Sequence, residues 1–331
     1  MALGLRLDSG MPKPTNTHRS APEKARYRIR NWAEYNRALV ARGGLTLWVD
    51  EAALCAWRAA PSGRRGAQPV YGDPAITCAL LLGAVFHLPL RSTEGLMRSV
   101  LQLLGATLPV PTYSTLSRRR AKLEVVLPRP PRSGAVHLVV DATGLKVYGE
   151  GEWKVKVHGA GKRRVWRKLH IGVDEKTGEV LACSLTESRP GDKHSLPALL
   201  SEAGPEVKQV SGDGGYDYRD CYVEIARHGA RASIVPRRTA QVRRDDPGFA
   251  ERNRNVEQIQ RVGRHHWKRE SGYTRRSLAE TGFMRLKTIF GAALGARLLT
   301  SQRAEARLRC AALNRMTQLG MPQSYPVPQP A

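Results

Sequence analysis

The stretch that decides the fold is VWRKLHIGVDEKTGEVLACSLTES, residues 165–188. Apolar side chains alternate with other residues up to Val173, and a second apolar run starts at Val180. Between them, Asp174–Gly178 has the composition of a turn. Alternation on both sides of a short polar turn predicts a β-hairpin whose strands are at least half buried.

Further strands are predicted on both sides of this hairpin. The short apolar runs are AVHLVVD (135–141), EVKQVSGD (206–213) and ASIVP (232–236). Helical patterns in KHSLPALLSEAG (193–204) and DYRDCYVEIARHG (217–229) separate the later strands. A hairpin followed by alternating strands and helices predicts an α/β domain with a sheet of mixed strand order.

The residues before this α/β domain have a different character. Residues 1–30 are basic and proline-rich, and we expect them to form a flexible arm. Residues 31–127 read as a series of helices, the last of which carries a basic triplet: Arg118, Arg119 and Arg120. Short helices followed by a basic helix match a helix-turn-helix pattern. A plain helical bundle with a solvated basic face is the alternative.

Proline-rich and basic segments suggest the remaining boundaries. PRPPRSG (128–134) is predicted to be a linker, the α/β domain to span 135–322, and 323–331 to be a tail. Within that domain, 237–269 has weak periodicity and many arginines, which favours a connection that faces phosphates over a solvated loop. Trp267 lies in this segment and could stack on an unpaired base or fill a core position.

The bulk composition points to a polyanionic partner. The chain has 331 residues with 54 Lys and Arg against 29 Asp and Glu, a formal net charge of +25. Such a charge is self-repelling, and nucleic acid is the first candidate partner because phosphate contacts supply most sequence-independent affinity. The longest apolar run, residues 75–90, contains His87 and Pro89 and is too short to span a membrane, so no membrane partner is expected.

The cysteines indicate a reducing, cytoplasmic compartment. There are five, scattered along the chain without C-x-x-C spacing, so neither a disulfide framework nor a zinc site is predicted. Cys55 and Cys78 lie in apolar helical patterns and are interpreted as small core residues.

Two aspartates occupy positions where α/β proteins concentrate function. Asp141 closes the run 135–141, and Asp213 is followed by Gly214 and Gly215. Ligands of α/β sheets bind at the carboxyl ends of strands. Each aspartate alone could be an ordinary turn or cap residue. If the two strands are neighbours, however, their carboxylates converge and would suit Mg²⁺, which prefers hard oxygen ligands.

A third carboxylate stands in YTRRSLAETGFMRLKTIFG, residues 273–291, where it is the lone acid among basic residues. On one helix, Tyr273, Arg276, Glu280 and Lys287 would span an arc of roughly 60° beside an apolar stripe. That placement directs Glu280 towards the sheet ends that carry the aspartates. A solvated, charge-balancing glutamate is the alternative.

These motifs together resemble a known family. VVDATGLKVYGEGEWKVKVHG, RRVWRKLHIGVD, VSGDGGYD and the Y-x2-R-x3-E-x6-K spacing resemble the DDE transposases of bacterial family-five insertion sequences. The resemblance implies an RNase H-like catalytic domain preceded by an all-α, helix-turn-helix-type DNA-binding domain. It also implies an acidic triad that holds two Mg²⁺ ions, with Mn²⁺ able to substitute: Asp141, Asp213 and Glu280. Signature residues near the transposon end would be Tyr273, Arg276 and Lys287, and Tyr273 could instead be a packing aromatic.

The resemblance implies a function as well. The protein would bind the terminal inverted repeats of an insertion sequence, cleave there, and join the 3′-OH to target DNA by metal-assisted phosphoryl transfer. It would act on double-stranded DNA as a homodimer or higher oligomer, in the cytoplasm and associated with the nucleoid. A nuclease or resolvase that lacks strand transfer and a non-catalytic DNA-binding regulator are the alternatives.

Overall fold

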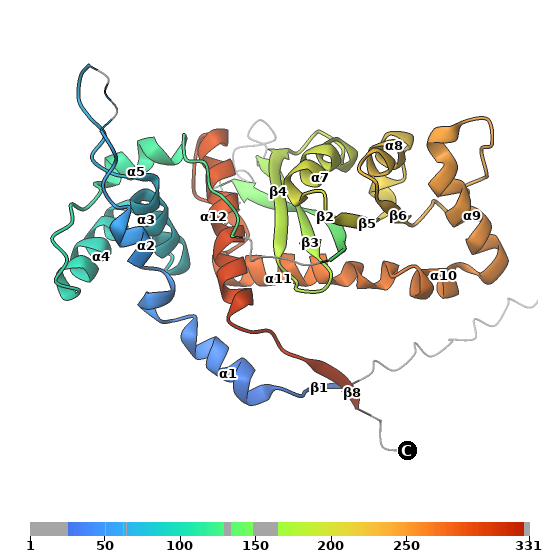
Figure 1. The fold of residues 1–331 in the computed structure, drawn as a ribbon, viewed down its shortest axis with the longest axis horizontal. Coiled ribbons are helices and arrows are strands. Elements are labelled where there is room, and N and C mark those ends of the chain that lie inside the picture. Colours follow the sequence, from blue (N-terminus) through green and yellow to red (C-terminus); the bar gives the residue numbers. More distant parts are fainter. Residues whose placement is uncertain are drawn as a thin grey trace, which may run out of the picture.

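A computed structural model describes residues 26–327 of this chain except 50, 62, 64, 129–133 and 148–164. The helices of the N-terminal part stand at one end of a central sheet, and α12 lies between the two (Figure 1). Most of the predicted arm, most of the predicted linker and residues 328–331 of the predicted tail lie outside the described residues.

The central sheet is six-stranded and mixed, as the strand and helix pattern predicts. Its order is β4-β3-β2-β5-β6, with β7 paired to β2. β2, β3 and β4 are antiparallel neighbours, whereas β5 and β6 continue from β2 in parallel. The bounds are β2 (Val136–Val147), β3 (Trp166–Asp174), β4 (Val180–Glu187), β5 (Val207–Gly212), β6 (Arg231–Ile234) and β7 (Ala293–Leu294).

The predicted hairpin is confirmed as β3 and β4, and its turn lies where the polar residues stand. The predicted end of the first strand at Asp141 is wrong. β2 continues to Val147, because the residues beyond Asp141 pair with β3 as far as Lys146, opposite Trp166. Lys146 and Val147 also pair with β7, a strand that lies far along the sequence.

Each face of the sheet packs on its own helices, as the alternation of side chains along a strand requires. Val139 of β2 shares a buried cluster with α11 and α12, whereas Leu138 and Val140 share another with α7 and α8. The helices are α7 (Leu196–Ala203), α8 (Arg219–Arg227), α9 (Ala250–Val262), α10 (Arg264–Glu270), α11 (Ser277–Phe290) and α12 (Leu299–Gln318). Short 3-10 turns precede or join them: η2 (Asp192–Ser195), η3 (Gly214–Tyr216), η4 (Pro247–Phe249) and η5 (Tyr273–Arg276).

The segment 237–269 is more ordered than its weak periodicity predicts. It holds η4, α9 and α10 rather than an irregular connection. Asn255 and Val256 of α9 are buried, and the Asn255 side-chain amide donates to the carbonyl of Ala232 on the edge strand β6. Contacts with the sheet edge thus stabilise a helix whose own sequence is largely polar.

The N-terminal region is helical, as predicted. The elements are α1 (Trp32–Ala41), η1 (Leu45–Leu47), α2 (Glu51–Cys55), α3 (Asp73–Val85), α4 (Leu90–Leu103) and α5 (Tyr113–Arg120). Thr112 caps α5 by accepting from the Thr115 N–H. The interpretation of Cys55 as a core residue is wrong, because it lies exposed at the end of the short α2, whereas Cys78 is buried in α3.

The helical region shares its core with the sheet. Ile76 and Leu81 of α3 belong to the same buried cluster as Val139 of β2 and Phe283 of α11, and α12 contacts α3, α5 and β4. The two ends of the described chain also meet, since β1 (Arg26–Ile29) pairs antiparallel with β8 (Ser324–Val327). Part of the predicted arm and part of the predicted tail are therefore paired strands.

No single helix in the described ranges is long and apolar enough to cross a membrane. Taken together, α3 and α4 reach the length and composition of a span, with a bend of 111° between them.

Candidate active site

Asp141 and Asp213 lie on neighbouring strands, Asp141 within the central strand β2 and Asp213 just beyond the end of β5. β2 and β5 are parallel neighbours with Val139 opposite Ser211, and each aspartate follows two residues later. Because side chains alternate along a strand, both aspartates project from the face on which α11 packs. The two carboxylates were expected to converge only if their strands are adjacent, and the strands are adjacent.

Glu280 reaches the same place through α11, whose Ala279, Phe283 and Leu286 are buried against the sheet. The Arg276 guanidinium lies between two acids. One of its nitrogens donates to Asp141 Oδ2 at 3.1 Å, and another donates to the Glu280 carboxylate. The fold thus joins two of the three predicted acidic residues through one cation.

The proximity of several carboxylates changes the pKa of Asp141. Burial raises the pKa of Asp141 above its usual value, and the charges of Asp213 and Glu280 add to the rise. The Ala142 N–H, which donates to Asp141 Oδ1 at 2.8 Å, and Arg276 oppose it. Such a carboxylate favours any arrangement that brings a cation to it.

A second aspartate, Asp217, anchors the end of the turn that carries Asp213. Asp213 Oδ1 accepts from the Gly215 N–H at 2.8 Å, so this residue is a cap of η3 as well as a candidate for chemistry. Asp217, whose side chain is 1% exposed, accepts from the Tyr222 hydroxyl at 3.0 Å, the Arg237 N–H at 3.0 Å and Arg252 Nε at 2.9 Å. The sequence interpretation missed Asp217, although it closes the same GDGGYD motif.

The basic and aromatic signature residues do not share one helix. Tyr273 and Arg276 belong to η5, and α11 begins at Ser277, so the predicted helix from Tyr273 is wrong by one turn. Tyr273 is half buried and lies 5.9 Å from the Trp267 ring, centroid to centroid. Lys287 Nζ donates to Thr143 Oγ1 on β2 at 2.7 Å, which holds its ammonium group near the strand that carries Asp141.

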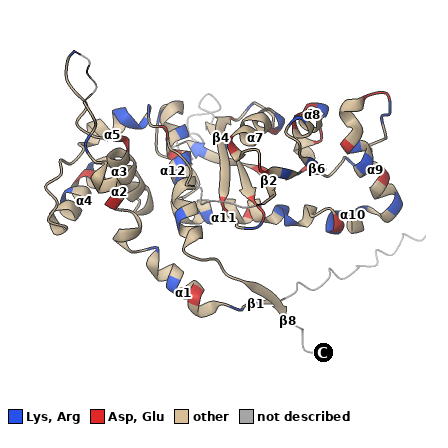
Figure 2. Cartoon of the chain, in the orientation of Figure 1, with Lys and Arg blue, Asp and Glu red and all other residues tan. Residues whose placement is uncertain are grey.

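Trp267 is fully buried in α10. Neither face of its indole is open to a base in this structure, which favours the core alternative over stacking. Several arginines of the same segment also have internal partners: Arg252 binds Asp217, and Arg264 donates to the carbonyl of Pro236 at 2.7 Å. Lys and Arg nevertheless recur along α9, α10 and α11 (Figure 2).

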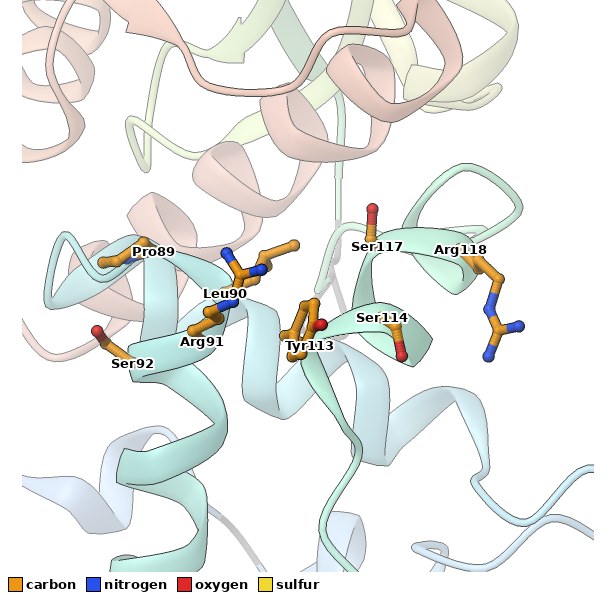
Figure 3. A pocket seen from close by; sticks show the side chains of 8 residues that line it. All are labelled: Pro89, Leu90, Arg91, Ser92, Tyr113, Ser114, Ser117 and Arg118. Carbon is orange, nitrogen blue, oxygen red and sulfur yellow. The ribbon is translucent and has the colours of Figure 1, made fainter.

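The basic triplet of α5 splits into three environments. Arg119 donates to Asp73 at 2.6 Å and to the Tyr71 carbonyl at 3.0 Å, while burial lowers the pKa of Arg120. Arg118 is exposed and borders a pocket of about 800 Å³ between the starts of α4 and α5 (Figure 3). Arg91 covers the Tyr113 ring in the same pocket, with its guanidinium carbon 4.4 Å from the ring centre.

The chemistry of the acidic residues fits a hard divalent cation. Carboxylate oxygens are the ligands that Mg²⁺ and Mn²⁺ prefer, and the guanidinium between Asp141 and Glu280 shows that a cation is accepted there. In this side-chain arrangement, no group of three or more His, Cys, Asp or Glu in the described ranges has the geometry of a metal site. Because Arg276 bonds to Asp141 Oδ2 and to the Glu280 carboxylate, a metal bound to the same oxygens would displace it.

Comparison with known families gives two matches. Residues 132–315 match a family model described as a transposase DDE domain, and residues 40–150 match a second model with the same description. The first match spans the whole central sheet, the three acids Asp141, Asp213 and Glu280, and most of α12.

Proposed function

Because this chain belongs to the DDE transposases, a family of enzymes that cut and join DNA using divalent metal ions, we propose that it moves an insertion sequence of the family-five type. It would bind the terminal inverted repeats, cleave DNA at the element ends and join the 3′-OH to target DNA. The observation that carries the proposal is that the acids come from adjacent elements, Asp141 and Asp213 from the neighbouring strands β2 and β5 and Glu280 linked to Asp141 through Arg276.

The acidic residues have a direct chemical role in this proposal. Asp141, Asp213 and Glu280 hold two Mg²⁺ ions, for which Mn²⁺ can substitute. Bound metal would activate the attacking oxygen and neutralise charge on the leaving one. Arg276, released from its carboxylate partners, binds a phosphate of the element end, and Lys287 binds another beside β2. Arginine and lysine suit this task because both donate several hydrogen bonds to phosphate oxygens.

Recognition of the ends is assigned to the helical region. Of the α5 triplet, Arg118 is the residue at an open surface, while Arg119 has an internal carboxylate partner. A net charge of +25 supports binding of long duplex segments by phosphate contacts. We propose that two or more copies act together on the two ends, in the cytoplasm at the nucleoid.

A strand-transfer reaction tests the proposal. Purified protein is incubated with a duplex that carries the element end, a target plasmid and Mg²⁺. A joined product supports a transposase, nicking without joining indicates a nuclease, and binding alone indicates a regulator.

Glu280→Gln sharpens this test. The variant is expected to bind end DNA like the parent and to lose cleavage, since the amide cannot replace a carboxylate ligand. Glu270→Gln, on the exposed end of α10, is the matched control and should cleave normally. Cleavage by Glu280→Gln within about tenfold of the parent rate would exclude Glu280 as a metal ligand.

A further inference from the structure

A fourth carboxylate lies beside the turn that carries Asp213. Asp192 is the first residue of η2, the short turn before α7. A Cβ added to Gly215 would stand 3.4 Å from Asp192 Oδ2 and 2.8 Å from Asp213 Oδ1. The two carboxylates therefore both lie against Gly215.

Two buried polar side chains near this acidic pair each have an atom without a hydrogen-bond partner in the described residues. Tyr216 is 1% exposed and its hydroxyl is unpartnered. Burial, followed by the charges of Asp192, Asp141 and Asp213, raises the pKa of Tyr216 well above its usual value. The Tyr216 ring packs against Gly212, the residue before Asp213, so it lies beside the turn that carries this aspartate.

The second unpartnered atom is on β3. His170 has a fully buried side chain, and its Nδ1 lies 3.9 Å from Asp192 Oδ1, too far for a direct hydrogen bond. Buried polar groups in folded proteins nearly always have a partner. An unpartnered buried atom beside a carboxylate indicates a polar ligand, and a water carried by a hydrated cation would be such a ligand.

Asp192 also has its own counter-charge. Lys168 Nζ donates to Asp192 Oδ1 at 2.8 Å and to the Pro190 carbonyl at 3.3 Å. The other oxygen of Asp192, Oδ2, is the one turned towards Gly215 and Asp213. This arrangement parallels that of Arg276, which neutralises Asp141 and Glu280.

From these contacts we infer that Asp192 is a fourth acidic residue of the divalent-cation site, acting on the Asp213 side with Lys168 as its counter-charge. The inference rests on the proposed function for the presence of a cation at Asp213. Because Mg²⁺ and Mn²⁺ keep water ligands in proteins, Asp192 Oδ2 offers an acceptor and Tyr216 a hydroxyl to that water. Asp192 supports the cation without belonging to the predicted triad.

The inference is tested by measuring how tightly the full chain binds Mn²⁺ in the absence of DNA, with electron paramagnetic resonance as the readout. Asp192→Asn is expected to weaken Mn²⁺ binding by about tenfold or more. Lys168→Met, which leaves the acidic residue without its counter-charge, is expected to strengthen it. Both substitutions break the same ion pair, so a purely structural pair would shift binding in the same direction in both variants.

Further variants distinguish a specific role of Asp192 in Mn²⁺ binding from a change in net charge and from misfolding. Asp220→Asn removes an exposed carboxylate that pairs with Lys193 and should bind Mn²⁺ like the parent. If Asp192→Asn does not fold, Tyr216→Phe removes one hydroxyl from the same cluster and is expected to weaken binding several-fold. Parent-like binding by whichever of these two variants folds overturns the inference, as do shifts of Asp192→Asn and Lys168→Met in the same direction.

Asp141→Asn distinguishes failure of the inference from failure of the proposed function. If Asp141→Asn loses Mn²⁺ binding while Asp192→Asn keeps it, the catalytic proposal stands and the role of Asp192 is refuted. If the parent protein binds no Mn²⁺ at all without DNA, the inference is refuted, and the strand-transfer reaction decides the proposed function separately.

Discussion

Replacing Arg276 by Met removes the guanidinium that binds both Asp141 and Glu280. The Arg276 and Asp141 side chains are 25% and 15% exposed, whereas Glu280 is 55% exposed. The Glu280 pair is close to a surface ion pair, worth about 0–1 kcal/mol. Loss of one partner from a fully buried pair costs about 3–5 kcal/mol, and the partial exposure here reduces that cost. Arg276→Met is therefore expected to lower the free energy of unfolding by about 2 kcal/mol at neutral pH without divalent ions.

The pH dependence of this loss has a defined sign. Burial already raises the pKa of Asp141, and removal of Arg276 raises it further, because the ionised form loses its cation. The cost is full above the raised folded-state pKa and disappears as the pH falls towards 3.8, the ordinary value for this carboxyl. The difference between Arg276→Met and the parent should thus be largest at neutral pH and should shrink towards pH 4.

Urea unfolding in the presence of EDTA, followed by tryptophan fluorescence, measures both effects. The matched control is Arg275→Met, because Arg275 is 55% exposed and pairs with Glu175 instead of the site. Its expected loss is within about 1 kcal/mol. Added Mn²⁺ should stabilise Arg276→Met more than the parent, since the metal no longer competes with a guanidinium. A loss no larger than that of Arg275→Met, or one that grows at acidic pH, would refute this account of the site.

Three further outcomes are expected. Asp217→Ala leaves Arg252, whose side chain is only 11% exposed, without its carboxylate and should cost about 3–5 kcal/mol in urea unfolding. The exposed Asp220→Ala should cost little, and a loss below about 1 kcal/mol for Asp217→Ala contradicts the anchoring role. Burial lowers the pKa of His170 to about 4 from 6.5, so the stability it contributes above pH 6.5 is lost as the pH falls towards 4. His170→Gln should therefore show a shallower fall of stability over that range, and parallel curves would contradict this. Arg118→Ala should reduce the slope of log K against log salt concentration for end binding by about one unit, while Arg119→Ala should mainly lower stability. An unchanged slope for Arg118→Ala would show that Arg118 does not contact a phosphate.

The elements that were predictable from sequence are those whose signal is local. The β3–β4 hairpin has alternation and a polar turn within one continuous stretch, and α8 has a clear apolar face. The extension of β2 beyond Asp141 was not predictable, because residues 142–147 gain their partners on β3, and at Lys146 and Val147 also on β7, only when the sheet assembles. α9 was missed for a similar reason, since its buried residues gain their partners only when the chain folds onto β6.

The ion pairs of the candidate site were also not predictable from the sequence, because they depend on tertiary contacts. The sequence singled out Asp141 and Asp213 and left open whether their strands are neighbours, which the fold decides. Nothing in the sequence indicated that Arg276 would bind two acids at once. Adjacent arginines look equivalent in a sequence, yet Arg118 borders a pocket while Arg119 bonds to Asp73. Whether an arginine serves the fold or a partner depends on which carboxylates the tertiary structure brings to it.

The buried cluster shared by α3, β2, α11 and α12 has a consequence for engineering. Independent modules can be exchanged between relatives, but here a cut between the helical region and the sheet would expose apolar surface on both pieces. A chimera that takes its helical region from a relative would need matching substitutions on α12 to fold. New end specificity is therefore expected to evolve by changes to solvent-facing residues around Arg118 rather than by replacement of the whole helical region.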